Sequence, residues 1–102
     1  MKGKLGSLYL NACGYVEIKT AAGPAKWELE HRVVMAQFLR RPLLPTEQVH
    51  HKNTIRTDNR IENLQLKVGG HGSGGDLFDM IADAERFLAL YRPAAQLLLA
   101  VA

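Results

Sequence analysis

The sequence predicts an α+β protein, because short segments that alternate like strands occur between two segments with helical periodicity. Residues 14–20 alternate polar and apolar side chains, as a half-buried strand does, whereas residues 28–39 place apolar side chains at helical spacing. A second helical stripe follows a glycine-rich segment late in the chain. The length of 102 residues suits one domain with one modest hydrophobic core.

A β-hairpin and a helix are expected in the first forty residues. Residues 5–10 can pair with the strand at residues 14–20, and a turn at residues 21–24 (AAGP) follows. The helix at residues 28–39 ends before Pro42. The apolar stripe of this helix contains Leu29, Val33 and Ala36. The strand at residues 14–20 has an apolar face with Val16 and Ile18, and an opposite face with Tyr15, Glu17 and Lys19.

Two further strands are expected to frame a polar loop. Residues 47–51 form a short strand, and residues 52–60 are polar and rich in turn-forming types. Residues 61–67 begin with a possible helical turn and end as a strand. A loop with five glycines in seven residues, 69–75, then leads to the last helix.

The last helix is expected to begin at Asp76, which can cap it, and to run to about Tyr91. Its apolar stripe has spacings of four, three, four and three residues: Leu77, Ile81, Ala84, Leu88 and Tyr91. Pro93 is expected to end the helix. We therefore expect one domain over residues 1–92 and an apolar tail over residues 93–102, which folds back as a small helix or contacts another chain.

The charge of the chain is unevenly distributed. The net charge is +3 at neutral pH, with +5 in residues 1–67 and −2 in residues 68–102. A basic region of this kind suggests an anionic partner, of which nucleic acid is the commonest. The one cysteine, Cys13, excludes an internal disulfide and a cysteine zinc site. No apolar run approaches the ~20 residues of a membrane span, and no signal peptide is evident, so we expect a cytoplasmic protein with no membrane partner.

Three histidines and an asparagine mark a candidate catalytic site. His50 and His51 end a strand, Asn63 precedes the next strand, and His71 lies in the glycine-rich loop. A neutral imidazole is well suited to deprotonate water near pH 7, and an amide oxygen can hold it in one tautomer. Two imidazoles with water and a phosphate oxygen also form a plausible open site for a divalent ion. These side chains therefore suit phosphodiester hydrolysis.

The same residues resemble a known signature. His50-His51, Asn63 and His71 are similar to the motif of HNH endonucleases, whose active site is a ββα-metal unit. The similarity covers roughly residues 14–92 and is to the small HNH proteins common in phage genomes. The blocks that carry it are residues 27–36, 41–45, 49–53 and 58–64. The resemblance implies a ββα-metal core braced by the N-terminal hairpin and helix, with the C-terminal helix at its side.

The resemblance also assigns roles. It implies that His51 is the general base, that Asn63 accepts a hydrogen bond from it, and that His50 and His71 bind one divalent ion (Mg, Mn, Co, Ni or Zn). The implied substrate is DNA, held mainly by its phosphate backbone, with a homodimer and phage packaging proteins as possible partners. Four residues are expected to contact phosphate: Lys52, Arg56, Arg60 and Arg32. For Arg32, support of the active-site strand is an equally weighted alternative.

Structural alternatives stand beside these roles. Adjacent strand residues face opposite sides, so His50 and His51 share a site only if the chain leaves strand geometry there, as we expect from the residues that follow. Asn59 is expected to stabilise the loop locally, and His31 to be a hydrogen-bonded structural residue. The alternative functions are a non-catalytic DNA-binding or phage accessory module with the same fold, and a structural metal-binding protein.

Overall fold

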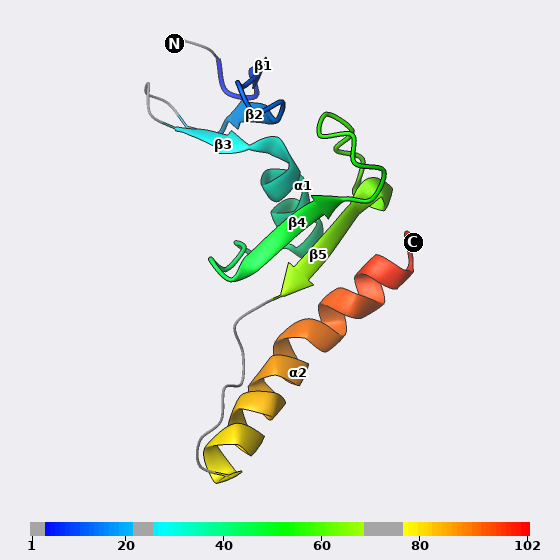
Figure 1. The fold of residues 1–102 in the computed structure, drawn as a ribbon. Coiled ribbons are helices and arrows are strands. Elements are labelled where there is room, and N and C mark those ends of the chain that lie inside the picture. The colour runs from blue at the N-terminus through cyan, green and yellow to red at the C-terminus, as the bar shows by residue number, and fades with distance from the viewer. Residues whose placement is uncertain (1–3, 22–25, 69–76) are drawn as a thin grey trace.

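A computed structural model describes residues 4–21, 26–68 and 77–102, and they form an α+β fold (Figure 1). The strands pair as two antiparallel sheets, one of order β1-β2-β3 and one of β4 with β5. This confirms the predicted fold class. The elements in chain order are β1 (Leu8–Leu10), β2 (Val16–Lys19), β3 (Trp27–Leu29), α1 (Glu30–Leu39), β4 (Glu47–His51), the 3-10 turn η1 (Ile61–Asn63), β5 (Leu64–Val68) and α2 (Leu77–Leu99).

The N-terminal sheet contains the predicted hairpin and one strand that was not predicted. Glu28 and Leu29, which were expected to begin the helix, lie in β3 instead, where Glu28 pairs with Ile18 of β2. The prediction was wrong because this segment gains cross-strand hydrogen bonds and side-chain pairing that outweigh the helical propensity of Glu28 and Leu29. The helix α1 therefore begins at Glu30, directly at the edge of the sheet.

The two faces of this sheet differ in how they are covered. Lys19 is only 6% exposed, and its ammonium group lies 5.8 Å from the centroid of the Trp27 ring. Leu8 and Leu10, which share the other face with Ile18, are 55% and 61% exposed. The face of the sheet that carries Lys19 and Trp27 is therefore the more buried one near Lys19. The aliphatic part of the Lys19 side chain packs on this face, and its charge stays beside an aromatic ring.

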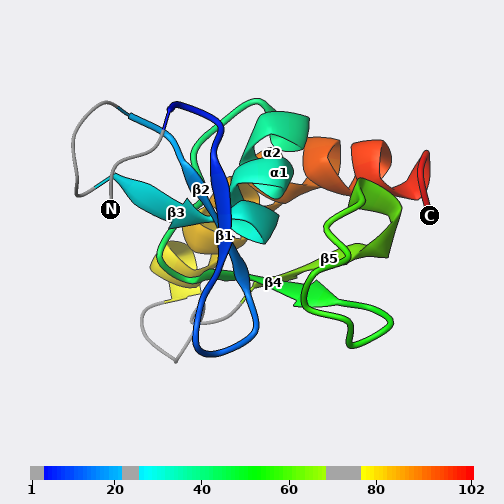
Figure 2. The same ribbon diagram turned by 90° about the horizontal axis from the view of Figure 1, so that it is seen from above.

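The core lies between α1 and the β4–β5 ribbon, and Figure 2 shows α1 lying along one side of that ribbon. Met35 of α1 is fully buried against Val49 of β4 and Leu64 of β5. Both strands have the predicted bounds to within one residue, and Val49 pairs with Leu66. Alternation then places His51 on the same side as Val49, so the core determines which way His51 faces.

A buried ion pair joins the end of α1 to the start of β4. Arg40 ends α1 in the left-handed conformation (φ 60°, ψ 36°), and Arg41 follows it. The two terminal nitrogens of Arg41 donate to the two carboxylate oxygens of Glu47, at 2.9 and 2.7 Å. Glu47 is fully buried and also accepts from the Leu44 amide and the Tyr91 hydroxyl. Tyr91 thereby attaches α2 to the same carboxylate.

Protein stability should depend on the ionisation of Glu47. Hydrogen bonds from Arg41 lower the pKa of Glu47 from 4.5 to about 2, against the opposing effect of burial. A depressed folded-state pKa stabilises the fold above the unfolded-state pKa, so this contribution should be lost as the pH falls from 4.5 towards 2. Urea unfolding at a series of pH values should show that slope, and Glu47→Gln should flatten it. A slope unchanged in Glu47→Gln would mean that other carboxylates cause it.

The helix α2 continues through Pro93 to Leu99, so the expectation that Pro93 ends it was wrong. Ala94 is 5% exposed, and Leu98 packs against the Met35 core. Burial of these two residues favours continuation of the helix and offsets the hydrogen bond that proline cannot donate. Part of the predicted apolar tail therefore packs on its own domain.

The N-terminal half of α2 extends away from the strands (Figure 1). Ile81 and Leu88, which belong to the predicted apolar stripe, are 47% and 48% exposed. The apolar stripe therefore correctly predicted a helix, and these two side chains in the N-terminal half of α2 remain largely exposed. Within the described residues, neither helix has the length and apolar character needed to cross a membrane.

Candidate active site at the end of strand β4

His50 and His51 lie on opposite faces of β4. The strand pairs regularly up to its last residue, with His50 opposite Gln65 and His51 opposite Leu64. His50 is exposed on the outer face, while His51 is half-buried on the face towards α1. The expectation that the chain leaves strand geometry at this pair was wrong, because β5 continues the ladder to this point.

The aromatic rings of His31 and Tyr15, from two other segments, lie close to the ring of His51. The ring centroid of His31, from α1, lies 5.0 Å from that of His51, and Tyr15, just before β2, lies 6.2 Å away. Tyr15 also stacks on His31 at 5.2 Å with an interplanar angle of 26°. The N-terminal sheet and α1 therefore both form the wall of the site, and the rings restrict how His51 can turn.

His31 is buried and neutral. Its pKa is lowered from 6.5 to about 4, first by burial and then by the charges of His51 and Arg32. Its Nδ1 atom has no hydrogen-bond partner among the described residues. The sequence predicted that His31 is a hydrogen-bonded structural residue, but its Nδ1 atom does not form such a bond with the described residues. Near pH 7, His31 presents an uncharged ring to His51.

Asn59, and not Asn63, contacts His51. The Asn59 side-chain oxygen lies 2.6 Å from His51 Nε2, and its amide nitrogen donates to Glu30 Oε1 at 2.8 Å. This corrects both the expected hydrogen bond from His51 to Asn63 and the purely local role given to Asn59. The only sequence signal was a second asparagine in the same polar loop, and nothing in the sequence linked Glu30 to it.

Asn63 holds the loop that follows β4. It is 6% exposed and exchanges hydrogen bonds with Asn53, accepting from its backbone amide at 3.1 Å and donating to its side-chain oxygen at 2.9 Å. It also donates to the Asp58 carbonyl at 2.8 Å. The Asn63 side chain therefore closes the base of the loop. It affects His51 only indirectly, by holding the loop segment that carries Asn59.

Replacing Asn63 by alanine should therefore lower stability. Three hydrogen-bonding groups of the loop, the Asn53 amide, the Asn53 side-chain oxygen and the Asp58 carbonyl, would lose their partner, and a group left unsatisfied in a buried position costs about 1–3 kcal/mol. Urea unfolding of Asn63→Ala measures this, with Asn59→Ala as the matched variant, which should unfold closer to the wild type. Equal stability of Asn63→Ala and the wild type would contradict the structural role of this amide.

Three of the four predicted phosphate contacts already have partners within the protein. Arg32 donates to the carbonyls of Glu47 and Leu44 at 2.6 and 3.3 Å, so it supports β4, the alternative left open from sequence. Arg60 forms two hydrogen bonds of 2.8 Å with Asp58 and holds the pKa of that carboxyl well below its usual range. The Asp58 carboxylate therefore reduces the charge that Arg60 offers to an anionic ligand, whereas the Arg32 guanidinium is held by backbone carbonyls.

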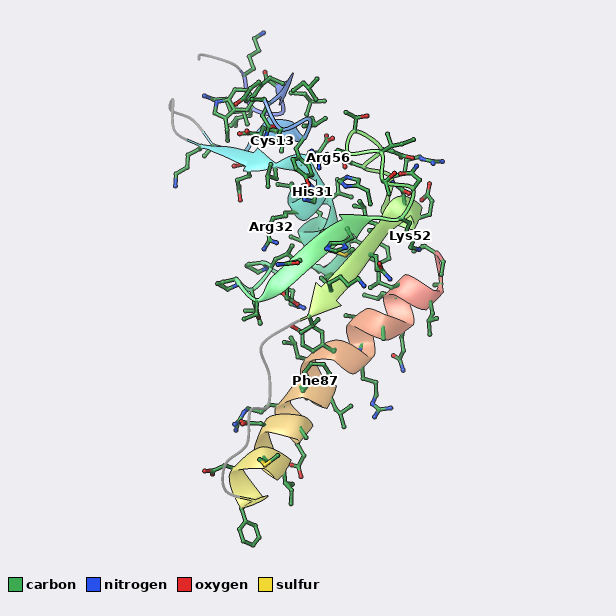
Figure 3. All side chains as sticks on the ribbon, viewed as in Figure 1. Cys13, His31, Arg32, Lys52, Arg56 and Phe87 are labelled. Carbon is green, nitrogen blue, oxygen red and sulfur yellow. The ribbon has the colours of Figure 1, made fainter. Side chains whose placement is uncertain are left out.

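Arg56 and Lys52 occupy different surroundings. Arg56 donates to the Cys13 carbonyl, and its guanidinium lies 4.8 Å from the Tyr15 ring centroid, which joins the loop after β4 to the N-terminal hairpin (Figure 3). The Lys52 side chain lines an apolar groove between β5 and the end of α2. Arg56 is therefore linked to the histidine rings through Tyr15, which stacks on His31.

A metal site is not assembled by the described residues alone. Within residues 4–21, 26–68 and 77–102, no group of three or more histidine, cysteine, aspartate or glutamate side chains is placed to hold an ion. His50 presents its imidazole on the outer face of β4. His71, the other predicted ligand, lies outside the described residues, as do the glycine-rich loop and Asp76.

Comparison with known proteins gives one match. Residues 28–67 match the family model described as HNH endonuclease. This segment runs from β3 through α1, β4 and the loop to β5, and it contains His31, His51, Asn59 and Glu30. No match was found among curated proteins or among solved structures.

Proposed function

Since residues 28–67 carry the match to the HNH endonucleases, we propose that the protein is a divalent-metal-dependent DNA endonuclease with His51 as its general base. One observation carries the assignment of the base. The 2.6 Å contact from Asn59 holds one ring nitrogen of His51 and leaves the other for a water molecule. His51 is also the last residue of its strand, where the chain turns into a polar loop.

In the proposed reaction, the free nitrogen of His51 takes a proton from a water molecule positioned in line with a backbone phosphorus. The resulting hydroxide forms a new bond to phosphorus, and the bond from phosphorus to the 3′-oxygen breaks. The leaving 3′-oxygen takes a proton from solvent. Asn59 keeps the imidazole oriented throughout, and the packed rings of Tyr15 and His31 limit its rotation.

We further propose that His50 and His71 hold the ion, with water completing the site. Imidazole donors favour manganese, cobalt, nickel or zinc over magnesium. A divalent ion would supply charge stabilisation for the phosphate oxygens. The imidazole of His50 is exposed and therefore accessible to an ion, although it lies on the face of β4 opposite to His51.

Substrate binding should come mainly from phosphate contacts. The Arg56 guanidinium lies 4.8 Å from the centroid of the Tyr15 ring, which stacks on His31, and Arg60, although paired with Asp58, is 67% exposed. Lys52 follows His51 directly in the chain. Because such contacts release counterions from DNA, affinity should fall as the salt concentration rises.

A nicking assay on supercoiled plasmid tests this function. The protein is incubated with magnesium, manganese, cobalt, nickel or zinc, and with a chelator as the blank. One site cuts one strand, so we expect conversion to the open circular form with at least one ion and none with the chelator. No cleavage with any ion, together with salt-sensitive retention of the plasmid, would overturn the nuclease and favour the DNA-binding module.

A further inference from the structure

Glu30 lies one hydrogen bond behind the proposed base. It is the first residue of α1, and its Oε1 atom accepts from the amide nitrogen of Asn59 at 2.8 Å. The amide oxygen of Asn59 in turn lies 2.6 Å from Nε2 of His51. A carboxylate, an amide and an imidazole therefore form a chain from the helix to the strand end.

The chemistry of the first member determines the direction of the whole chain. An ionised carboxylate can only accept hydrogen bonds, so Asn59 must turn its NH₂ group towards Glu30. Its oxygen then faces His51 and can only accept, which requires a proton on Nε2. The lone pair of a neutral His51 is therefore on Nδ1. Without Glu30, the Asn59 amide could turn over and donate to Nε2, which would move the proton to Nδ1.

We propose that Glu30 is a positioning residue, which fixes the Asn59 amide and through it the tautomer of His51. This inference rests on the proposed function only in taking His51 as the base. Glu30 does not contact His51 through any described hydrogen bond, and it would act on the reaction only through Asn59. Its place in the first turn of α1 gives it a second possible role, because a negative charge there stabilises a helix.

The ring nitrogens of His51 report the tautomer directly. Nitrogen-15 spectra of the metal-free protein, at a pH where the ring is neutral, distinguish a protonated Nε2 from a protonated Nδ1. We expect the Nε2–H form in the wild type. In Glu30→Gln, the new side chain can accept from Asn59 or donate to it, so the spectra should show both forms. A wild-type Nδ1–H form would overturn the proposal.

A reciprocal exchange separates positioning from helix stability. In the double variant Glu30→Gln with Asn59→Asp, residue 30 donates, residue 59 only accepts, and the Nε2–H form should return. The kcat for nicking should fall about tenfold in Glu30→Gln, a loss typical of residues that orient a catalytic group. The double variant should recover most of it, whereas a helix-stabilising role would give no recovery.

The matched control is Glu28→Gln. Glu28 lies two residues away, on the exposed side of β3, and bonds to the Thr20 hydroxyl at 2.5 Å. Its replacement removes the same charge without affecting Asn59, so the tautomer and kcat should not change. If Glu30→Gln leaves both unchanged as well, the proposal fails. If the wild type does not nick DNA but its tautomer responds to Glu30→Gln, the positioning role stands and the nuclease proposal fails.

Discussion

Replacing His51 by alanine should lower the rate of metal-dependent plasmid nicking by about 10²–10⁴-fold, the usual contribution of a general base. The side chain is half-buried, and its hydrogen bond goes to Asn59, so alanine removes the base without removing a core residue. Single-turnover nicking of the plasmid measures the loss, and filter retention of DNA should be nearly unchanged.

The neighbouring histidine provides the control for this experiment. His50→Ala removes an imidazole from the outer face of the same strand, and for a metal ligand the lost activity should return at higher ion concentration. No ion concentration should restore His51→Ala. Normal cleavage by His51→Ala would refute the assignment of the base, and equal rescue of both variants would make His51 a ligand instead.

Replacing Arg41 by methionine should destabilise the fold by about 3–5 kcal/mol, because it leaves the buried Glu47 carboxylate without its cation. Glu47 is fully buried, and both of its oxygens accept from Arg41. Urea unfolding measures the loss. The double variant Arg41→Met with Glu47→Leu removes the stranded charge and should recover much of the stability.

An exposed pair in the same protein provides the comparison. Arg60 and Asp58 also form two hydrogen bonds, but Arg60 is 67% exposed, so Arg60→Met should destabilise the fold much less than Arg41→Met does. Equal effects of Arg41→Met and Arg60→Met would mean that burial does not set the strength of the Glu47 pair. The attachment of α2 through Tyr91 would then need another explanation.

The central ribbon could be predicted from the sequence because its pattern is local. Alternation over residues 47–51 identifies a strand regardless of its partner, and the polar loop separates it from residues 64–68. The strand β3 could not be predicted in this way. It has three residues, Trp27 to Leu29, and becomes a strand only by pairing with β2.

The site was predicted only in part for a similar reason. His51 belongs to a motif of neighbouring residues, but the sequence does not show how the loop closes and so does not decide between Asn59 and Asn63 as its hydrogen-bond partner. Asn63 closes the loop through Asn53, and this places Asn59 at the imidazole. Glu30 and Tyr15 join the site from segments 21 and 36 residues away, which no local pattern could reveal.

The alternation along β4 limits which changes of chain length the protein can accept. Glu47 and His51 occupy the same face, four residues apart, and each has partners that it reaches only from that face. Deleting one residue between them reverses the face of one or the other, so a chain shortened there keeps either the buried ion pair or the inward imidazole. Length variation among natural or engineered variants should therefore be absent from residues 48–50.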